Sequence, residues 1–268
     1  MLTERQKDIL RRAANSDRVE VEELSAHYDV SPQTIRKDLN DLCERGLLTR
    51  VHGGARAPNS VSNTTYQHRR ESYAEEKTRI GQAAAACIPN NSSVIINIGT
   101  TTEMVARALY DHTDLIVITN NINVVTILSG SPSKELILAG GVVRQSDGGI
   151  VGEATMEFIR QFRADFAVIG ASAVDENGII LDFDMREVSV ARTIIESARK
   201  VVLVIDSSKF ERRSTVRICD VSAIDYVVCD SEPPARFRQA CLENDCEIIV
   251  AEELQDLSVQ HEGIARVR

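Results

Sequence analysis

The sequence lacks the long apolar segments that a membrane protein needs. Its longest apolar runs, such as residues 201–205, fall far short of the roughly 18 consecutive apolar residues that span a bilayer. The first residues, Met-Leu-Thr-Glu-Arg-Gln-Lys-Asp, also lack the apolar core of a secretory signal. We therefore expect no transmembrane helix and a protein that stays in the cytoplasm.

The chain also lacks the motifs that hold metals or nucleotide cofactors. No Cys-x-x-Cys pair and no zinc-finger spacing occurs, so we expect free, mostly buried thiols and no metal site. Neither a Walker loop nor a Gly-x-Gly-x-x-Gly fingerprint is present, so no cofactor is indicated. The six cysteines are Cys43, Cys87, Cys219, Cys229, Cys241 and Cys246.

Length and charge favour two domains of different character. At about 150 residues per domain, a chain of 268 residues with 43% hydrophobic and 26% charged residues predicts two globular domains. The net charge is −9, but residues 1–56 carry ten basic and ten acidic residues, so the excess negative charge lies in the rest. The acidic remainder of the chain repels DNA, so any DNA contact must come from a local basic surface within residues 1–56.

The first 57 residues show the pattern of three short helices and a wing. Ser31 can cap the third helix and Pro32 suits its first turn, which predicts a tight helix-turn-helix at about residues 20–39. The third helix ends at Gly46, after which residues 47–51 favour a strand and residues 52–56 a turn. The apolar positions with helical spacing are Ile9, Leu10, Val21, Leu24, Tyr28, Ile35, Leu39 and Leu42.

A change of pattern separates this domain, residues 1–57, from a second one. Residues 58–73 are polar and aperiodic, which predicts a linker. In residues 74–268, helical stretches alternate with β-branched runs, which predicts a mostly parallel α/β sheet covered on both faces. The predicted strands are residues 94–98, 115–119, 135–139, 166–170, 201–206, 226–229 and 247–250.

The start of the third helix carries side chains suited to duplex DNA. Glutamine can bond adenine, arginine guanine, and threonine a base or a phosphate, from a helix in the major groove. Basic side chains on the wing suit an adjacent phosphate or the minor groove. A winged helix used for protein contacts, with Arg36 and Lys37 paired to Asp38 and Asp41, is the alternative. The expected DNA contacts are Ser31, Gln33, Thr34, Arg36, Lys37, Asn40, Arg50, His52 and Arg56.

Two segments carry a resemblance to a known family. Val-Ser-Pro-Gln-Thr-Ile-Arg-Lys-Asp-Leu at residues 30–39 and Gly-Leu-Leu-Thr-Arg-Val-His-Gly-Gly-Ala at residues 46–55 resemble the N-terminal domain of DeoR-type bacterial transcriptional repressors. The resemblance implies sequence-specific binding of operator DNA. The family usually has a second arginine where this chain has Lys37, which keeps the charge but lacks the bidentate fork of arginine.

In the second domain, a predicted strand runs into Gly99 and three threonines that open a helix. Gly99 permits a sharp turn, and the N–H groups and hydroxyls at such a helix N-terminus can bind phosphate. Threonines that simply cap the helix are the alternative. The carboxyl ends of parallel strands share one edge of a sheet, where ligands bind. There, Arg144 either binds phosphate or is solvated, and the glycines before Glu153 form either an anion-binding turn or a loop.

The second domain also resembles the DeoR-type effector domain, which is similar in fold to ribose-5-phosphate isomerase. Residues 147–154, 158–166 and 206–210 are most similar to a subgroup that responds to glycerol 3-phosphate. The resemblance implies this effector and a glycerol-utilisation regulon, with another sugar phosphate as the alternative. The expected effector contacts are Gly99, Thr100, Thr101, Thr102, Asn120, Asn121, Gly140, Gly141, Arg144, Gly152, Asp184, Glu187 and Lys209.

An isomerase-like enzyme is a further alternative, because Asp182, Asp184 and Glu187 lie close in sequence and could supply acid and base groups. The isomerase carries Asp-Gly-Ala-Asp at the end of a strand, where this chain has Ile-Gly-Ala-Ser at residues 169–172 and so lacks both carboxylates. Replacement of one of them by Asp184 is the alternative. We therefore expect a binding domain without catalysis. We expect a regulator with two binding sites, in which the effector lowers the affinity for operator DNA. Because the operator has paired half-sites, we expect a dimer or tetramer.

Overall fold

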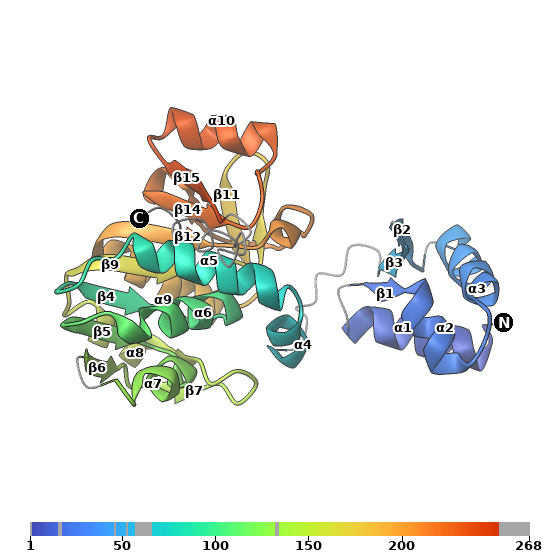
Figure 1. Cartoon of the computed structure of the whole chain (residues 1–268), viewed down its shortest axis with the longest axis horizontal. Helices are drawn as coiled ribbons and strands as arrows, with labels where there is room; N and C mark the ends of the chain where they lie inside the picture. Colours follow the sequence, from blue (N-terminus) through green and yellow to red (C-terminus); the bar gives the residue numbers. More distant parts are fainter. Residues whose placement is uncertain are drawn as a thin grey trace, which may run out of the picture.

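The computed structural model describes residues 2–15, 18–45, 47–51, 53–56, 66–131 and 134–251. Within these ranges the chain forms an N-terminal winged helix-turn-helix domain and a larger α/β domain (Figure 1). No helix in the described part of the chain is long and apolar enough to cross a membrane.

The N-terminal domain packs three helices against a small antiparallel sheet with the strand order β1-β3-β2. The stripe predicted for the third helix is buried, because Ile35, Leu39 and Leu42 lie in one apolar cluster with Ile9 of the first. The predicted winged helix-turn-helix is thereby confirmed. The elements are α1 (Glu4–Asn15), β1 (Val19–Glu20), α2 (Val21–Tyr28), α3 (Pro32–Glu44), β2 (Thr49–Val51) and β3 (Gly54–Arg56).

The wing differs from the expectation in one respect. Residues 54–56, expected in a turn, form β3, which pairs with both β1 and β2. Gly54 is needed there because a Cβ atom on it would overlap the carbonyl group of Val19 in β1. The turn of the wing instead contains Gly53, whose φ of +76° favours glycine. Gly46 and His52 lie outside the described residues.

The second domain is built on a seven-stranded sheet in which every strand pair is parallel. All seven predicted strands are present, so the predicted parallel α/β fold is confirmed. The strand order is β15-β14-β12-β9-β4-β5-β6. The strands are β4 (Ser93–Ile96), β5 (Leu115–Thr119), β6 (Lys134–Leu138), β9 (Ala164–Ile169), β12 (Ala198–Val204), β14 (Tyr226–Cys229) and β15 (Glu247–Val250).

Helices cover both faces of this sheet (Figure 1). Successive side chains of a strand point to opposite faces, so Val94 and Ile96 join one buried cluster and Ile95 the other. The first cluster contains side chains of α5 (Ala74–Ala86), α6 (Thr100–Ala108) and α7 (Ile122–Leu128). The second contains side chains of α8 (Glu153–Ile159), α9 (Met185–Glu196) and α10 (Ala235–Glu243).

The strand order places a topological switch point between β4 and β9. From β4 the chain moves outward to β5 and β6, then returns to β9 beside β4 and moves outward in the other direction. At such a point the connections after the two central strands diverge and leave a crevice at their carboxyl ends. The residues after β4 and β9 therefore form the expected ligand-binding edge of the sheet.

Shorter elements complete the second domain. Asp182 ends a strand of a small antiparallel sheet with the order β10-β11-β13. The sequence patterns did not predict these short strands. They are β10 (Ala173–Val174), β11 (Ile179–Asp182) and β13 (Val216–Asp220), with a β7–β8 hairpin (Val142–Val143, Ile150–Val151) and the 3-10 helices η1 (Leu109–Asp111), η2 (Ser207–Phe210) and η3 (Val221–Ala223).

A helix occupies part of the expected linker. Residues 58–73 were expected to be irregular, but Tyr66–Glu71 forms α4. The hydroxyl of Tyr66 donates to Glu103 Oε2 in α6 at 2.9 Å, which ties the helix to the α/β domain. The tyrosine hydroxyl bond thus stabilises a helix that is too short to show periodicity in the sequence.

Candidate functional site

The first candidate site is the exposed side of α3. Ser31 caps the helix, and its hydroxyl accepts a hydrogen bond from the N–H of Thr34 at 3.2 Å. Because the apolar stripe of α3 faces the core, the polar side chains lie on the opposite side. Gln33, Arg36, Lys37 and Asn40 are exposed, and Thr34 is half-buried.

Two acidic residues of α3 pair with arginines other than Arg36. The carboxylate of Asp38 is buried and accepts from Arg5 Nε at 2.6 Å, while Asp41 accepts from Arg45 Nε at 3.0 Å. The protein-contact alternative paired these two carboxylates with Arg36 and Lys37. Arg36 instead lies 3.9 Å from Glu22 of α2, and both side chains are exposed. The basic groups of α3 are thus available to an anionic partner.

The structure adds a residue that the sequence patterns missed. Arg5 of α1 lies beside the start of α3 and lines a surface hollow there with Ser31, Gln33, Thr34 and Lys37. Its guanidinium is placed by the ion pair with Asp38. Only the packing of α1 against α3 brings these positions together, so no local signal identifies Arg5.

The basic residues predicted on the wing differ from one another in exposure. Arg50 in β2 is exposed. Arg56 ends β3, is half-buried, and lies with Nη1 3.4 Å from the carbonyl oxygen of Glu211. The prediction for His52 falls outside the described residues.

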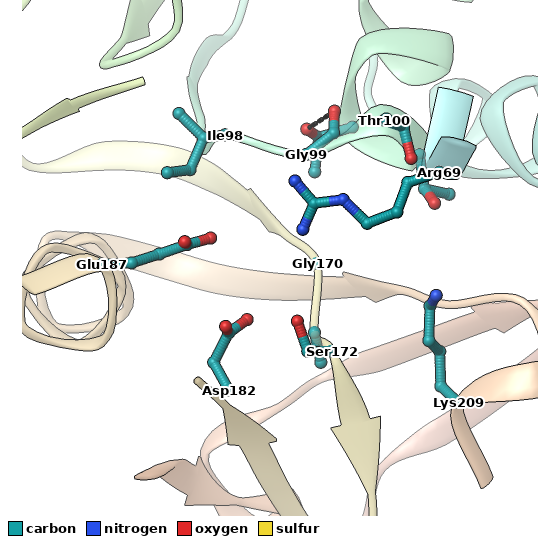
Figure 2. Close-up of a pocket in the computed structure, with 12 residues that line it drawn as sticks. Arg69, Ile98, Gly99, Thr100, Gly170, Ser172, Asp182, Glu187 and Lys209 are labelled. Carbon is teal, nitrogen blue, oxygen red and sulfur yellow. Dashed lines mark hydrogen bonds between the residues drawn. The ribbon is translucent and has the colours of Figure 1, made fainter. Parts of the chain in front are cut away.

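The second candidate site is a pocket at the switch point of the large sheet (Figure 2). It is lined by the residues after β4, the residues after β9, the end of β11, and single side chains from α4, α9 and η2. The lining residues are Arg69, Ile98, Gly99, Thr100, Thr101, Thr102, Gly170, Ala171, Ser172, Asp182, Glu187 and Lys209.

One wall of the pocket is the N-terminus of α6. Gly99 caps the helix with a φ of +148°, and the first intrahelical bond runs from the N–H of Glu103 to Gly99 O at 3.1 Å. The preceding N–H groups, on Thr100 and Thr101, therefore have no partner within the helix. The hydroxyl of Thr102 donates to the carbonyl oxygens of Asn97 and Gly99 at 2.8 Å, so it stabilises the turn itself.

Two basic side chains add positive charge near this wall. Lys209 in η2 is largely buried, and its ammonium points into the pocket from below in Figure 2, 3.4 Å from Asp206 Oδ2. Burial works against ionisation of Asp206, but the Lys209 ammonium holds the pKa of this carboxyl below its usual range. Arg69 of α4 extends across the pocket with its guanidinium between Thr100 and Glu187 (Figure 2). This side of the pocket is suited to an anion.

Two carboxyl groups face the pocket from the other side. Figure 2 shows Asp182, at the end of β11, and Glu187, in the first turn of α9, pointing inward. Burial raises the pKa of Asp182, and burial together with the charge of Asp182 raises the pKa of Glu187 to about 7. These groups can accept hydrogen bonds from hydroxyl groups of a ligand. Among the described residues, no group of three side chains with metal-ligand chemistry gathers.

The geometry separates the predicted effector residues into two sets. Gly99, the three threonines, Glu187 and Lys209 meet in the pocket. Asn120 and Asn121 follow β5 instead, where the Nδ2 of Asn120 donates to Ile150 O at 3.0 Å and the side chain of Asn121 caps α7. Gly140 and Gly141 follow β6, with Gly141 against Thr155, and Gly152 caps α8.

Arg144 and Asp184 also lie outside the pocket lining. The guanidinium of Arg144 contacts Asp147 at 2.5 Å, Glu187 at 2.8 Å and Asp184 at 3.3 Å. Asp184 caps α9 by accepting from the N–H of Arg186 at 2.9 Å. Arg144 is therefore neither solvated nor in the pocket, and it holds Glu187, which is in the pocket.

Other pocket residues were absent from the predicted contacts. Residues 170–172 follow the predicted strand that ends at Gly170, so the rule that ligands bind at the carboxyl ends of strands could have identified them. Asp182 was considered only as an acid or base group. Arg69 was placed in a linker, and no local signal connects it to the pocket.

A winged helix-turn-helix domain joined to an α/β domain with a small-molecule pocket at its switch point defines a transcriptional regulator controlled by a ligand. Models of two known domain families match the chain, the DeoR-like helix-turn-helix domain at residues 5–61 and the DeoR C terminal sensor domain at residues 72–231. The chain belongs to the DeoR family of transcriptional regulators, and DNA is its partner.

Several relatives extend over nearly the whole chain. The chain is 45% identical to the glycerol-3-phosphate regulon repressor of Escherichia coli (strain K12), over 92% of this chain and 98% of the relative. It is 46% identical to the glycerol-3-phosphate regulon repressor of Haemophilus influenzae, over 85% and 89%, and 38% identical to the E. coli repressor CsqR, over 93% and 95%.

Solved structures with limited similarity include ribose 5 phosphate isomerase A from Neisseria gonorrhoeae, with a TM-score of 0.38, 14% identity and coverage of 51% and 53%. A Pyrococcus horikoshii translation initiation factor eIF-2B has a TM-score of 0.48, 16% identity and coverage of 84% and 95%.

Proposed function

We propose that the protein represses a regulon for glycerol and glycerol 3-phosphate use, and that glycerol 3-phosphate releases it from operator DNA. The support is the extended similarity to repressors of that name, 45% identity over 92% of the chain, together with a pocket whose chemistry suits this ligand. The second domain is proposed to bind its ligand without converting it.

The DNA-binding half of the proposal rests on the exposed side of α3. A recognition helix places the residues of its N-terminal part against base edges in the major groove. Arg36 and Gln33 are proposed to contact bases, and Lys37 and Arg5 to contact phosphates. The other proposed contacts are Ser31, Thr34 and Asn40 on α3, and Arg50, His52 and Arg56 on the wing.

The observation that carries the effector half is the polarity of the pocket. Backbone N–H groups of Thr100 and Thr101, with Lys209, form a donor-rich side, and Asp182 and Glu187 form an acceptor side. Glycerol 3-phosphate has a phosphate at one end and hydroxyls at the other. The phosphate is proposed to bind at the N-terminus of α6 and the hydroxyls at the carboxyl groups.

The predicted effector residues outside the lining are proposed to act indirectly. Asn120, Asn121, Gly140, Gly141 and Gly152 shape the loops around the pocket, and the ion pairs of Arg144 and Asp184 orient Glu187. Linkage requires that operator DNA weaken effector binding by the same factor as effector weakens DNA binding, typically about 5- to 150-fold. Paired half-sites need paired recognition helices, so a dimer or tetramer is proposed.

Thermal unfolding of the full chain with glycerol 3-phosphate, glycerol and other sugar phosphates tests the effector. A ligand at about 100 times its dissociation constant stabilises by about 2.7 kcal/mol, which shifts the unfolding temperature clearly. A shift with glycerol 3-phosphate and none with glycerol supports the proposal. A shift with a different sugar phosphate alone replaces the effector, and the absence of any shift contradicts an effector pocket.

An isomerase-like activity is the second candidate, and one observation favours it. The pKa of Glu187 near 7 is suited to an acid or base group. Residues 170–172, Gly-Ala-Ser, supply no carboxylate at the end of β9. Turnover of ribose 5-phosphate above a heat-denatured control would establish this activity, and none is expected.

A further inference from the structure

The short helix α4 lies at the edge of the effector pocket, to which it contributes Arg69. It is the first described element after β3, and it is fixed to the α/β domain at two points. At its start, the hydroxyl of Tyr66 donates to Glu103 Oε1 at 3.1 Å and Oε2 at 2.9 Å, and accepts from Asn123 Nδ2 at 3.1 Å. Burial and this bond to Glu103 raise the pKa of Tyr66 to about 12.

The second point of attachment is a buried lysine. The ammonium of Lys77 in α5 donates to the carbonyl oxygen of Ser72 at 2.6 Å and to that of Arg69. It thereby binds carbonyl groups at the end of α4. Burial lowers the pKa of Lys77 to about 8, and the carbonyl contacts satisfy two of its three donors. The backbone of Arg69 is thus held at the pocket edge.

The side chain of Arg69 is poorly satisfied where it lies. Its side chain is 18% exposed, and its Nε is buried without a hydrogen-bond acceptor in the described part of the chain. Its Nη2 lies 3.6 Å from Asp147 Oδ2, beyond good hydrogen-bond distance. That carboxylate is already bonded to Arg144 at 2.5 and 2.9 Å and to the N–H of Gly149 at 3.2 Å. A phosphate in the pocket would be a better acceptor for Arg69.

The Arg69 side chain also occupies the space that a ligand needs. It lies across the pocket in Figure 2, and the cavity that remains is about 40 Å³. That is room for about three water molecules, which is less than a phosphorylated triol requires. Entry of such a ligand therefore requires the guanidinium to move.

We propose that Arg69 is the residue that reports effector binding to the DNA-binding domain, because its guanidinium leaves Asp147 for the phosphate of the effector and pulls α4 against the contacts that hold it at Tyr66. The inference rests on the proposed function, since it needs an anionic effector in this pocket. The Tyr66–Glu103 contact opposes this shift of α4, and the shift changes how the recognition helix α3 is held.

The test uses the full chain and two variants of neighbouring arginines. Arg69→Gln removes the charge at the pocket, and Arg70→Gln removes the same charge from an exposed position of α4. DNA affinity is measured by fluorescence anisotropy on a duplex that the wild-type protein selects from a random-sequence pool. Binding of glycerol 3-phosphate is measured by titration calorimetry, and folding by thermal unfolding without ligand.

We expect Arg69→Gln to bind the duplex without effector as the wild type does, to bind glycerol 3-phosphate about ten-fold more weakly or worse, and to show no release of DNA. Arg70→Gln should behave as the wild type in all three measurements. An Arg69→Gln protein that binds the effector, or releases DNA, as the wild type does would overturn the inference.

A third variant separates effector binding from its effect on DNA binding. Tyr66 lies outside the pocket and its hydroxyl opposes the shift of α4, so Tyr66→Phe should bind the effector at least as tightly as the wild type while changing the factor by which the effector weakens DNA binding. An unchanged factor contradicts a role for α4. If the wild-type protein binds neither glycerol 3-phosphate nor another sugar phosphate, the proposed function fails. The wild-type protein is measured first, so this outcome is distinguished from a failure of the inference about Arg69.

Discussion

The guanidinium of Arg144 lies 2.8 Å from Oε2 of Glu187 and 2.5 Å from Oδ2 of Asp147. One arginine therefore joins a carboxylate inside the effector pocket to the carboxylate that Arg69 approaches from α4. Two ion pairs of Arg144 thus link Glu187 in the pocket to Asp147 beside it.

The first prediction concerns the pH dependence of stability. The pKa of Glu187 is raised from 4.5 to about 7 by burial and by Asp182, so the folded state binds a proton there that the unfolded state has lost between these values. Its contribution to stability is fully present below pH 4.5 and is lost as pH rises through 7. Thermal unfolding of Glu187→Gln, measured from pH 4 to 8, should lack the loss of stability that ionisation of Glu187 causes.

Glu196→Gln is the matched control, because Glu196 is exposed on the same helix. Its unfolding should follow the wild-type pH profile. Identical pH profiles for Glu187→Gln and the wild type would contradict the raised pKa of Glu187.

A second prediction concerns base contacts. Arg36→Ala should weaken binding to the selected duplex by about 1–3 kcal/mol and relax its sequence preference, because the variant cannot make the proposed bidentate contact to guanine. Arg45→Ala removes an exposed arginine from the other end of α3, where it pairs with Asp41 at 3.0 Å, and should leave affinity nearly unchanged. Equal effects of the two changes in anisotropy titrations would argue against α3 as the recognition helix.

A third prediction separates phosphate from base contacts. If Lys37 neutralises a phosphate, Lys37→Ala should reduce the slope of log affinity against log salt by about one and weaken binding to all sequences alike. Titrations at several salt concentrations measure this slope. An unchanged slope with altered sequence preference would assign Lys37 to a base instead.

The turn before α6 gives a prediction of stability. The Thr102 hydroxyl is buried and donates to two carbonyl oxygens, so Thr102→Val should destabilise the folded state by about 1–3 kcal/mol. Thr78→Val is the control, because the hydroxyl of Thr78 bonds to Ala74 O from an exposed position of α5. Chemical denaturation compares the two, and a smaller loss for Thr102→Val would contradict its role in holding the turn.

A last prediction concerns the wing. A Cβ at Gly54 would overlap the carbonyl group of Val19, so Gly54→Ala should separate β3 from β1 and destabilise the N-terminal domain by about 2 kcal/mol or more. Gly53→Ala meets no neighbouring atom but has a positive φ, so it should cost about 1 kcal/mol. Hydrogen exchange of the β1–β3 pairing measures both, and the reverse order of effects would contradict the packing.

Local patterns predicted both domains because their signals are short in range. The stripe of Ile35, Leu39 and Leu42 and the β-branched runs of the seven strands reflect which residues favour helix or strand and are buried. The cap at Ser31 and the turn at Gly99 were likewise predictable, since a few neighbouring residues determine them. The helix α4 was not predicted, because a six-residue helix has no period to detect.

The sequence by itself determined a winged helix-turn-helix, a parallel α/β domain and a polar turn at the start of α6. The tertiary structure decided which strand ends share the pocket. Asn120 follows β5, next to β4 but away from β9, whereas Gly170 follows β9 at the switch point and Arg69 comes from α4. Strand order and the packing of remote segments depend on interactions across the whole domain, and no local pattern of residues records them.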